Sequence, residues 1–383
     1  MIRRAALGLA LLLLPSLATA GDRTRTPDML RGDVELRYAG SLQFVRLVDR
    51  TVAAGVRTEV GRSTLQRHGL TLGGAFSPYH GIAITLDLLP ISLHDKRAYA
   101  SANDMRLDPD AGLPTMVGGS ELDPDTLAAS AAQRNHVGFG DMRLGVRVVA
   151  FAQEGVPGRE APANLAFDVS LRLPTGGNHD AVRDNGTAGP GVGGPGVSIG
   201  LTASRNIAGV EPWVSLAYTH NGPYRQELVD ASGAPSTPPV DPDDPTPDAQ
   251  GRWTLNRADS VALRFGTELL VNRNDEKDTE ARFDVGAGLT YVGPDEISVG
   301  RILPAPLDAT IGHLAVTGEH IVANVDLGLR IRPIRLIEVR VDVGGTWTSP
   351  HTVERIGEKS YSVETGADTF GLRWGLAVRA RIR

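Results

Sequence analysis

The 383-residue chain contains no cysteine, so disulfide frameworks, thiolate chemistry and a cysteine-linked lipid anchor are excluded. Aromatic residues make up only 5% of the chain, lysine is scarce beside arginine, and the net charge of -6 argues against a nucleic-acid partner. After Ala20 no apolar run is long enough for a membrane helix. A position in a bilayer would therefore require strands closed into a barrel, because an open sheet leaves backbone groups unpaired in lipid.

The first twenty residues have the features of a secretory signal. Arg3 and Arg4 precede a short apolar core, and Ala18-Thr19-Ala20 forms a small-residue cleavage site. The core is too short to cross a membrane as a helix. We therefore predict a cleaved export signal over residues 1–20 and a single domain over residues 21–383.

Apolar and polar residues alternate with almost no errors in four consecutive segments from residue 279 to the C-terminus. The last segment places these residues on one face: Phe370, Leu372, Trp374, Leu376, Val378, Ala380 and Ile382. Successive side chains of a strand point to opposite faces, so each segment has one apolar face and one polar or glycine-rich face. The segments run about twelve to fourteen residues, which exceeds the usual strand of a soluble sandwich and matches a tilted strand crossing a bilayer.

The same alternation recurs from the N-terminus and predicts about 12 strands. Short connections fall near Ser77, Gly155, Ile207, Asn274 and Pro333. Long connections fall at residues 49–62, 94–136, 176–196, 222–257, 294–318 and 349–368. Bacterial barrels have an even strand number, short periplasmic turns and long extracellular loops. We therefore predict an all-β fold, a transmembrane antiparallel β-barrel with both termini in the periplasm. A soluble β protein is the alternative.

Two short motifs stand at the predicted fourth and fifth strands. They are Gly138-Phe139-Gly140-Asp141-Met142-Arg143-Leu144-Gly145 and Leu173-Pro174-Thr175-Gly176. These motifs resemble the Gly-Asp strand and the Pro-Thr-Gly strand end of the outer-membrane channels linked to aromatic degradation, the MetA-pathway phenol-degradation family. Barrel portions of some OmpA-type proteins are also similar. The resemblance implies an outer-membrane channel for small, hydrophobic molecules, although the chain ends in Arg381-Ile382-Arg383 and not in the aromatic residue common in such barrels.

Arginines and carboxylates occupy the predicted inward faces in nearly equal numbers. The lumen-lining candidates are Arg143, Arg147, Arg172, Arg264, Glu268, Arg282, Asp284, Asp326, Arg330, Glu338, Arg340, Asp342, Arg373, Arg379 and Arg381. Rings of charge set which permeants enter a pore. The similar numbers of positive and negative side chains, with arginine as the main cation, instead favour a lumen crossed by Arg–carboxylate ion pairs. The cluster of Arg379, Arg381 and Arg383 near the periplasmic mouth is the candidate anion-attracting ring.

Other polar clusters predict no further chemistry. Asp241, Asp243, Asp244 and Asp248 offer calcium ligands, but the prolines among them favour a solvated loop. The glycine-rich run 189–196 lacks the Lys-Ser/Thr of a phosphate loop. None of the nine histidines stands in a serine-bearing catalytic motif or in a cluster with acidic partners. We therefore predict no enzyme activity, no metal and no cofactor.

These observations together predict a passive channel for small molecules in the outer membrane of a Gram-negative-type cell. Its partners would be outer-membrane lipids, a small-molecule permeant and the barrel assembly machinery, with no nucleic acid. The loops at residues 92–136 and 222–251 would gate or narrow the lumen. The main alternative is a barrel plugged by its own salt bridges, with a structural or adhesive role through its extracellular loops. A surface enzyme is the third hypothesis.

Overall fold

The computed structural model describes residues 30–49, 58–100, 105–108, 113–116, 132–153, 162–176, 193–227, 252–274, 276–298, 314–355, 358–365 and 369–382. The regular elements in these ranges are all β-strands. No helix in the described ranges is long and apolar enough to cross a membrane. The predicted signal, Arg383 and the aspartates at 241–248 lie outside the described residues.

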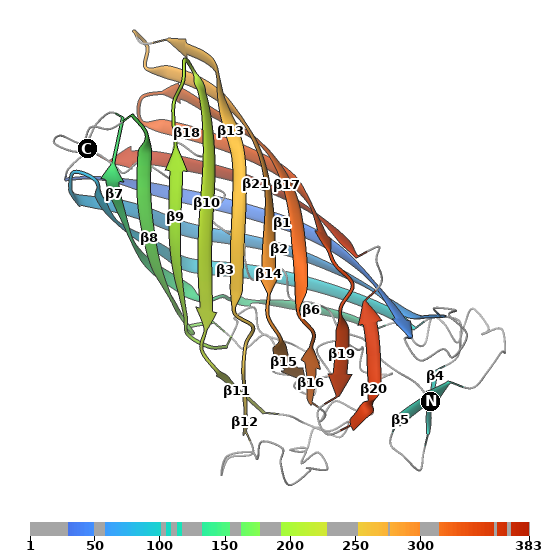
Figure 1. The fold of residues 1–383 in the computed structure, drawn as a ribbon. Coiled ribbons are helices and arrows are strands. Elements are labelled where there is room, and N and C mark those ends of the chain that lie inside the picture. Colours follow the sequence, from blue (N-terminus) through green and yellow to red (C-terminus); the bar gives the residue numbers. More distant parts are fainter. Residues whose placement is uncertain are drawn as a thin grey trace.

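Twelve antiparallel strands close into a barrel, as the alternation predicts (Figure 1). In order around the wall they are β1 (Arg31–Asp49), β2 (Thr58–Tyr79), β3 (Ile82–Ala100), β6 (Ala132–Phe139) continued by β7 (Met142–Phe151), β8 (Asn164–Leu173), β9 (Gly196–Ser204), β10 (Val210–Asn221), β13 (Ser260–Asn274), β14 (Thr279–Val292), β17 (His320–Ile334), β18 (Ile337–Thr348) and β21 (Phe370–Ile382). The last strand closes the wall against the first, from the pair Gly32–Ile382 to the pair Phe44–Phe370.

The long connections contain strands that the alternation did not predict. These are β4 (Met105–Asp108), β5 (Leu113–Met116), β11 (Tyr224–Glu227), β12 (Arg252–Leu255), β15 (Asp295–Ser298), β16 (Leu314–Thr317), β19 (Thr352–Arg355) and β20 (Glu358–Thr365). In addition, β2 begins at Thr58, β3 continues to Ala100 and β6 begins at Ala132. The predicted loops 49–62, 94–136, 222–257, 294–318 and 349–368 are therefore partly wrong. Backbone pairing between neighbouring hairpins, such as β16 with β19, needs no long apolar face.

The predicted fourth strand is β7, and it is preceded by β6, which lies largely within the predicted loop 94–136. Both β6 and β7 pair with β3, and they are separated at Gly140 and Asp141. Pro90 of β3 lies opposite this interruption, and its carbonyl oxygen accepts a hydrogen bond from the Gly140 backbone N at 2.6 Å. Proline has no N–H to give to the ladder, which explains why regular pairing stops here.

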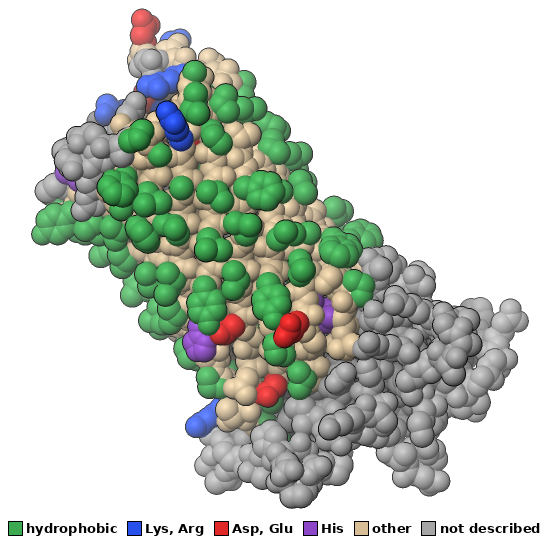
Figure 2. All heavy atoms as spheres, in the orientation of Figure 1, with side chains coloured by type: hydrophobic (Ala, Val, Ile, Leu, Met, Phe, Trp, Pro, Cys, Tyr) green, Lys and Arg blue, Asp and Glu red, His purple; other side chains and the backbone are tan. Residues whose placement is uncertain are grey.

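The outward faces of the wall carry the apolar side chains. Figure 2 shows them across the face in view, with mostly basic groups beyond the end with the short turns and several acidic groups toward the other end. Val325 and Phe265 are 56% and 51% exposed, values typical of a protein surface and not of a core. Soluble proteins rarely expose contiguous apolar areas above a few hundred Å². The barrel therefore has its apolar surface outside, as a lipid environment requires.

Glycines on the inward faces allow large side chains to lie flat against the wall. Trp213 of β10 covers Gly266 of β13 and Gly286 of β14. A Cβ at Gly266 would lie 2.7 Å from Trp213 Cζ2, and one at Gly286 would lie 3.2 Å from the same atom. The glycines of the polar face thus make space for neighbouring inward side chains.

A membrane position of β17 is testable by a charge placed on its outward face. Leu327→Arg should lower the free energy of unfolding by about 2–4 kcal/mol, since the site is in the middle of the strand. Urea unfolding in phospholipid vesicles, followed by tryptophan fluorescence, measures the change. The matched control Ile334→Arg, at the end of the same strand, should cost about 0–1 kcal/mol. Equal costs at the two positions would contradict a β17 that crosses the bilayer.

Candidate functional site: the barrel lumen

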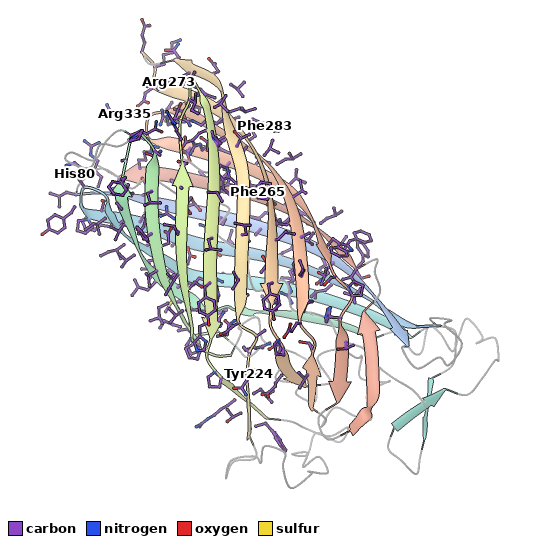
Figure 3. The ribbon with its side chains drawn as sticks, in the orientation of Figure 1. His80, Tyr224, Phe265, Arg273, Phe283 and Arg335 are labelled. Carbon is purple, nitrogen blue, oxygen red and sulfur yellow. The ribbon has the colours of Figure 1, made fainter. Side chains whose placement is uncertain are left out.

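A cavity of about 650 Å³ occupies the barrel interior. At the end with the short turns its lining includes Arg31, Arg335 and Arg381, and toward the other end it reaches Thr219 and Ser260. Figure 3 shows Arg335 and His80 near the short turns, and Tyr224 at the opposite end among the long connections. The cavity therefore runs along the barrel axis from the predicted periplasmic end.

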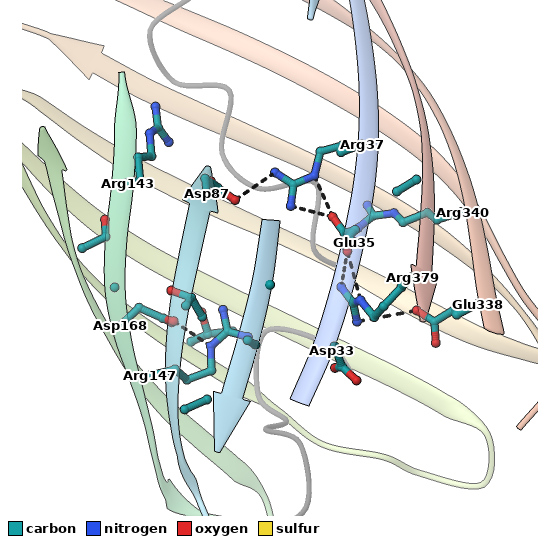
Figure 4. Close-up of a pocket in the computed structure, with 18 of the residues that line it drawn as sticks. Asp33, Glu35, Arg37, Asp87, Arg143, Arg147, Asp168, Glu338, Arg340 and Arg379 are labelled. Atoms are coloured by element: carbon teal, nitrogen blue, oxygen red, sulfur yellow. Dashed lines mark hydrogen bonds and ion pairs between the residues drawn. The ribbon is translucent and has the colours of Figure 1, made fainter. Parts of the chain in front are cut away.

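An ion-pair cluster spans β1, β18 and β21 on one side of the cavity (Figure 4). Glu35 accepts from two arginines, with Arg37 Nη2 at 2.6 Å from Oε1 and Arg379 Nη2 at 2.7 Å from Oε2. Arg379 Nη1 also lies 3.7 Å from Glu338 Oε1, and Arg381 Nη2 lies 3.6 Å from its Oε2. The arginines of the predicted anion-attracting ring are thus paired with carboxylates where the structure describes them.

A second cluster thickens the wall formed by β10, β13, β14 and β17. Glu268 is fully buried, and its Oε1 lies 2.7 Å from both Arg282 Nη1 and Arg330 Nη2. Arg282 also contacts Glu211, at 3.4 Å, and Glu280. Because Glu268, Glu211 and Arg282 do not line the cavity, these ion pairs are part of the wall rather than a surface for a permeant.

The wall formed by β8, β9 and β10, across the barrel from β21, is lined mainly by small and hydroxyl side chains. The inward residues that reach the cavity there are Asp168, Ser170, Ser198, Gly200, Thr202, Ser215, Ala217 and Thr219. Asp168 pairs with Arg147 of β7 at 2.6 Å. These hydroxyl residues were not among the predicted lining residues, although they lie at inward positions of the alternation.

The predicted lumen residues separate into two groups. Those that line the cavity are Arg143, Arg147, Arg264, Arg330, Glu338, Arg340, Asp342, Arg379 and Arg381. The others, which do not, are Arg172, Glu268, Arg282, Asp284, Asp326 and Arg373. Asp284 accepts a hydrogen bond from Trp213 Nε1 at 3.3 Å, and Arg373 pairs with Asp326. An effect of either group on permeation stays a prediction.

The two sequence motifs contact each other at the interruption between β6 and β7. Asp141 Oδ1 accepts from the Gly176 backbone N at 3.0 Å, and Thr175 Oγ1 accepts from the Met142 backbone N at 2.9 Å. A Cβ at Gly176 would lie 2.6 Å from the Gly140 carbonyl carbon, so a larger residue would clash. These motif residues therefore replace the missing ladder contacts and have a structural role.

Beyond the cavity, six buried residues form what we call the outer collar: Arg172, Tyr224, Arg257, Asp295, His320 and His351. The Arg257 guanidinium lies 4.2 Å from the Tyr224 ring centroid, and its Nη1 lies 3.4 Å from Asp295 Oδ2. The collar residues come from β8, β11, β15, β17 and the segments after β12 and β18. None of them lines the cavity, which therefore ends below the collar.

Two histidines stack within the collar. The ring centroids of His320 and His351 are 4.1 Å apart, and each Nδ1 contacts the backbone carbonyl two residues earlier, at 3.1 and 3.0 Å. Burial, together with the charge that His320 would carry, lowers the pKa of His351 to about 4. The described residues contain no group of three His, Asp or Glu side chains arranged to hold a metal.

No protein-family model and no curated protein matches the chain. The structure is similar to an outer membrane channel from Pseudomonas putida F1, with a TM-score of 0.50 and 11% identity over 94% of this chain and 98% of that chain. A Pseudomonas aeruginosa FadL homologue gives a TM-score of 0.38 and 10% identity, over 91% of this chain and 90% of that one. A TodX monoaromatic hydrocarbon channel mutant gives a TM-score of 0.41 and 8% identity, over 96% of this chain and 93% of that one. The first likeness assigns the fold to the class of outer-membrane β-barrels.

Removing one member of the buried ion-pair cluster around Glu268 should destabilise the folded barrel, because its partners would stay buried without a counter-charge. Glu268→Ala should lower the free energy of unfolding by about 3–5 kcal/mol, because it leaves buried arginine charges uncompensated. Urea unfolding in detergent or vesicles measures the loss. The control Arg335→Gln removes an ion pair with Asp278 in which the arginine side chain is 60% exposed and the aspartate side chain 39%. It should lower the free energy of unfolding by less than about 1 kcal/mol. A comparable small loss for Glu268→Ala would contradict a structural role of the cluster.

The neutral state of His351 should make stability depend on pH. Its pKa is lowered in the folded protein, so between about pH 6.5 and pH 4 His351 is protonated in the unfolded chain and neutral in the folded one. Stability should therefore fall as pH falls through this window, by up to about 3 kcal/mol from this residue. Urea unfolding of the wild type and of His351→Gln between pH 7.5 and pH 4 gives the difference. Identical pH slopes for the two proteins would rule out this origin.

Proposed function

We propose that the protein is a passive outer-membrane channel for small molecules. The observation that carries the proposal is an axial cavity with a polar lining inside a closed barrel whose outer surface is apolar. Such a wall places a hydrated path across a bilayer while every strand remains paired. Export through the signal at residues 1–20 and insertion by the barrel assembly machinery belong to the same proposal. The likeness to an outer membrane channel from Pseudomonas putida F1 is consistent with it.

The lining supports passage of small polar solutes rather than bulk flow. A barrel of twelve strands is narrow, and the ion pairs around Glu268 occupy part of its section. The outer collar lies beyond the cavity on the side of the long connections, and we propose that passage requires the collar to rearrange. The gating loops predicted at 92–136 and 222–251 lie largely outside the described residues.

The plugged, structural barrel remains a second candidate because of one observation. The collar residues are buried, Arg257, His320 and His351 each at 5% exposure or less, which is what a plug at the outer end of the cavity would require. A channel differs from a plugged barrel in opening at least transiently, which conductance detects directly.

Planar-bilayer recording of the purified, refolded protein tests the proposal. We expect stepwise conductance with a weak preference for anions, measured as a reversal potential in asymmetric KCl. Arg381→Glu should shift that potential toward cation preference, because the Arg381 side chain is 40% exposed at the periplasmic mouth. The double variant Arg340→Gln/Asp342→Asn, which removes one internal ion pair without changing net charge, should leave the preference unchanged. A folded, heat-modifiable protein that never conducts would favour the plugged barrel.

A further inference from the structure

The inward face of β7 brings two arginines to the cavity. Gly145 lies between Arg143 and Arg147 in the inward phase of the strand, and all three line the cavity. A Cβ at Gly145 would lie 2.5 Å from Thr85 Oγ1 of β3 and 3.4 Å from Ser170 Cβ of β8. Gly145 is buried, and the place that its side chain would take is filled by Thr85, so two hydroxyl residues and two guanidinium groups border this part of the cavity. We call this group of five residues the β7 recess.

Arg143 differs from the other arginines drawn around the cavity. In Figure 4, Arg37, Arg147 and Arg379 make ion pairs, whereas Arg143 has none. Within the described ranges no carboxylate lies within ion-pair distance of Arg143, although Asp87 is its register partner on β3. The ion pair that Asp87 forms is with Arg37, at 4.0 Å. The positive charge of Arg143 is therefore available to a molecule in the cavity.

We propose that the β7 recess binds the carboxylate of a small monocarboxylate, which would be the permeant class of the channel. The guanidinium of Arg143 presents a planar pair of donors that matches the two oxygens of a carboxylate. Thr85 and Ser170 add hydroxyl donors on either side. The inference rests on the proposed function for its transport role, but binding at the recess is measurable without transport.

The charges around the recess favour a monoanion. Asp168 is paired with Arg147 at 2.6 Å, whereas Asp87, at 4.0 Å from Arg37, and Asp141 both lie near enough to attract Arg143. Arg143 makes no ion pair with either aspartate, so its guanidinium is left to meet the single charge of a monoanion. A dianion such as a phosphate monoester would carry a second charge toward Asp87 and Asp168 without a cation to meet it. The cavity of about 650 Å³ has room for a small acid.

Isothermal titration of propionate into the full-length protein folded in detergent micelles tests the binding step. We expect saturable binding of propionate and none of propionamide, its neutral counterpart. Arg143→Gln should weaken propionate binding roughly tenfold or more, since it removes a charge-assisted pair of hydrogen bonds. Arg143→Lys should give an intermediate affinity because it keeps the positive charge but loses the planar pair of N–H donors. Each variant is first shown to be folded by heat-modifiable migration.

The matched control is the double variant Asp326→Asn/Arg373→Gln, which removes an ion pair outside the cavity lining without changing net charge and should bind propionate within about twofold of the wild type. Unchanged affinity in Arg143→Gln would overturn the proposal, as would equal binding of propionamide. Equally strong competition by chloride would show a general anion site and overturn the carboxylate assignment. Bilayer conductance is recorded separately. Propionate binding without conductance would refute the channel and leave the site, whereas conductance without propionate binding would refute the site alone.

Discussion

Pairing of the backbone is the constraint on which the rest of the structure depends. An unpaired N–H or C=O group costs several kcal/mol in hydrocarbon, so a sheet with an apolar outer surface is stable in a bilayer only when its edges meet. Here β21 meets β1 through an uninterrupted run of pairs from Gly32–Ile382 to Phe44–Phe370. Where regular pairing fails, beside Pro90, the Asp141 and Gly176 contacts supply replacement hydrogen bonds.

Closure also determines what the interior must accommodate. Alternation places almost every charged strand residue inside, where arginines pair with carboxylates across neighbouring strands and glycines admit their long side chains. The pairs are unevenly distributed, since the Glu268 cluster fills one wall while hydroxyl residues line another. This asymmetry leaves a cavity beside β7 and makes the free charge of Arg143 significant.

Much of the fold was predictable from alternation alone. The twelve wall strands, their order and their outward faces follow from segments such as 370–382, because the period of two is local to each strand. The short strands β15, β16, β19 and β20 were not predictable, because they are held by neighbouring backbone and carry no long apolar face. The inward position of the candidate arginines was predicted, but the particular partners of Arg379 and Arg282 were not.

The sequence by itself determined which face of each strand is apolar and which charges lie inside, because residues i and i+2 share a face whatever the strand pairs with. Only the tertiary structure decided which charges neutralise each other. Arg143 and Arg147 are four positions apart on one strand and look equivalent in sequence. The fold brings Asp168 to Arg147, while Asp87 pairs with Arg37 and leaves Arg143 facing the cavity. Register between distant strands sets these distances, and local alternation does not encode it.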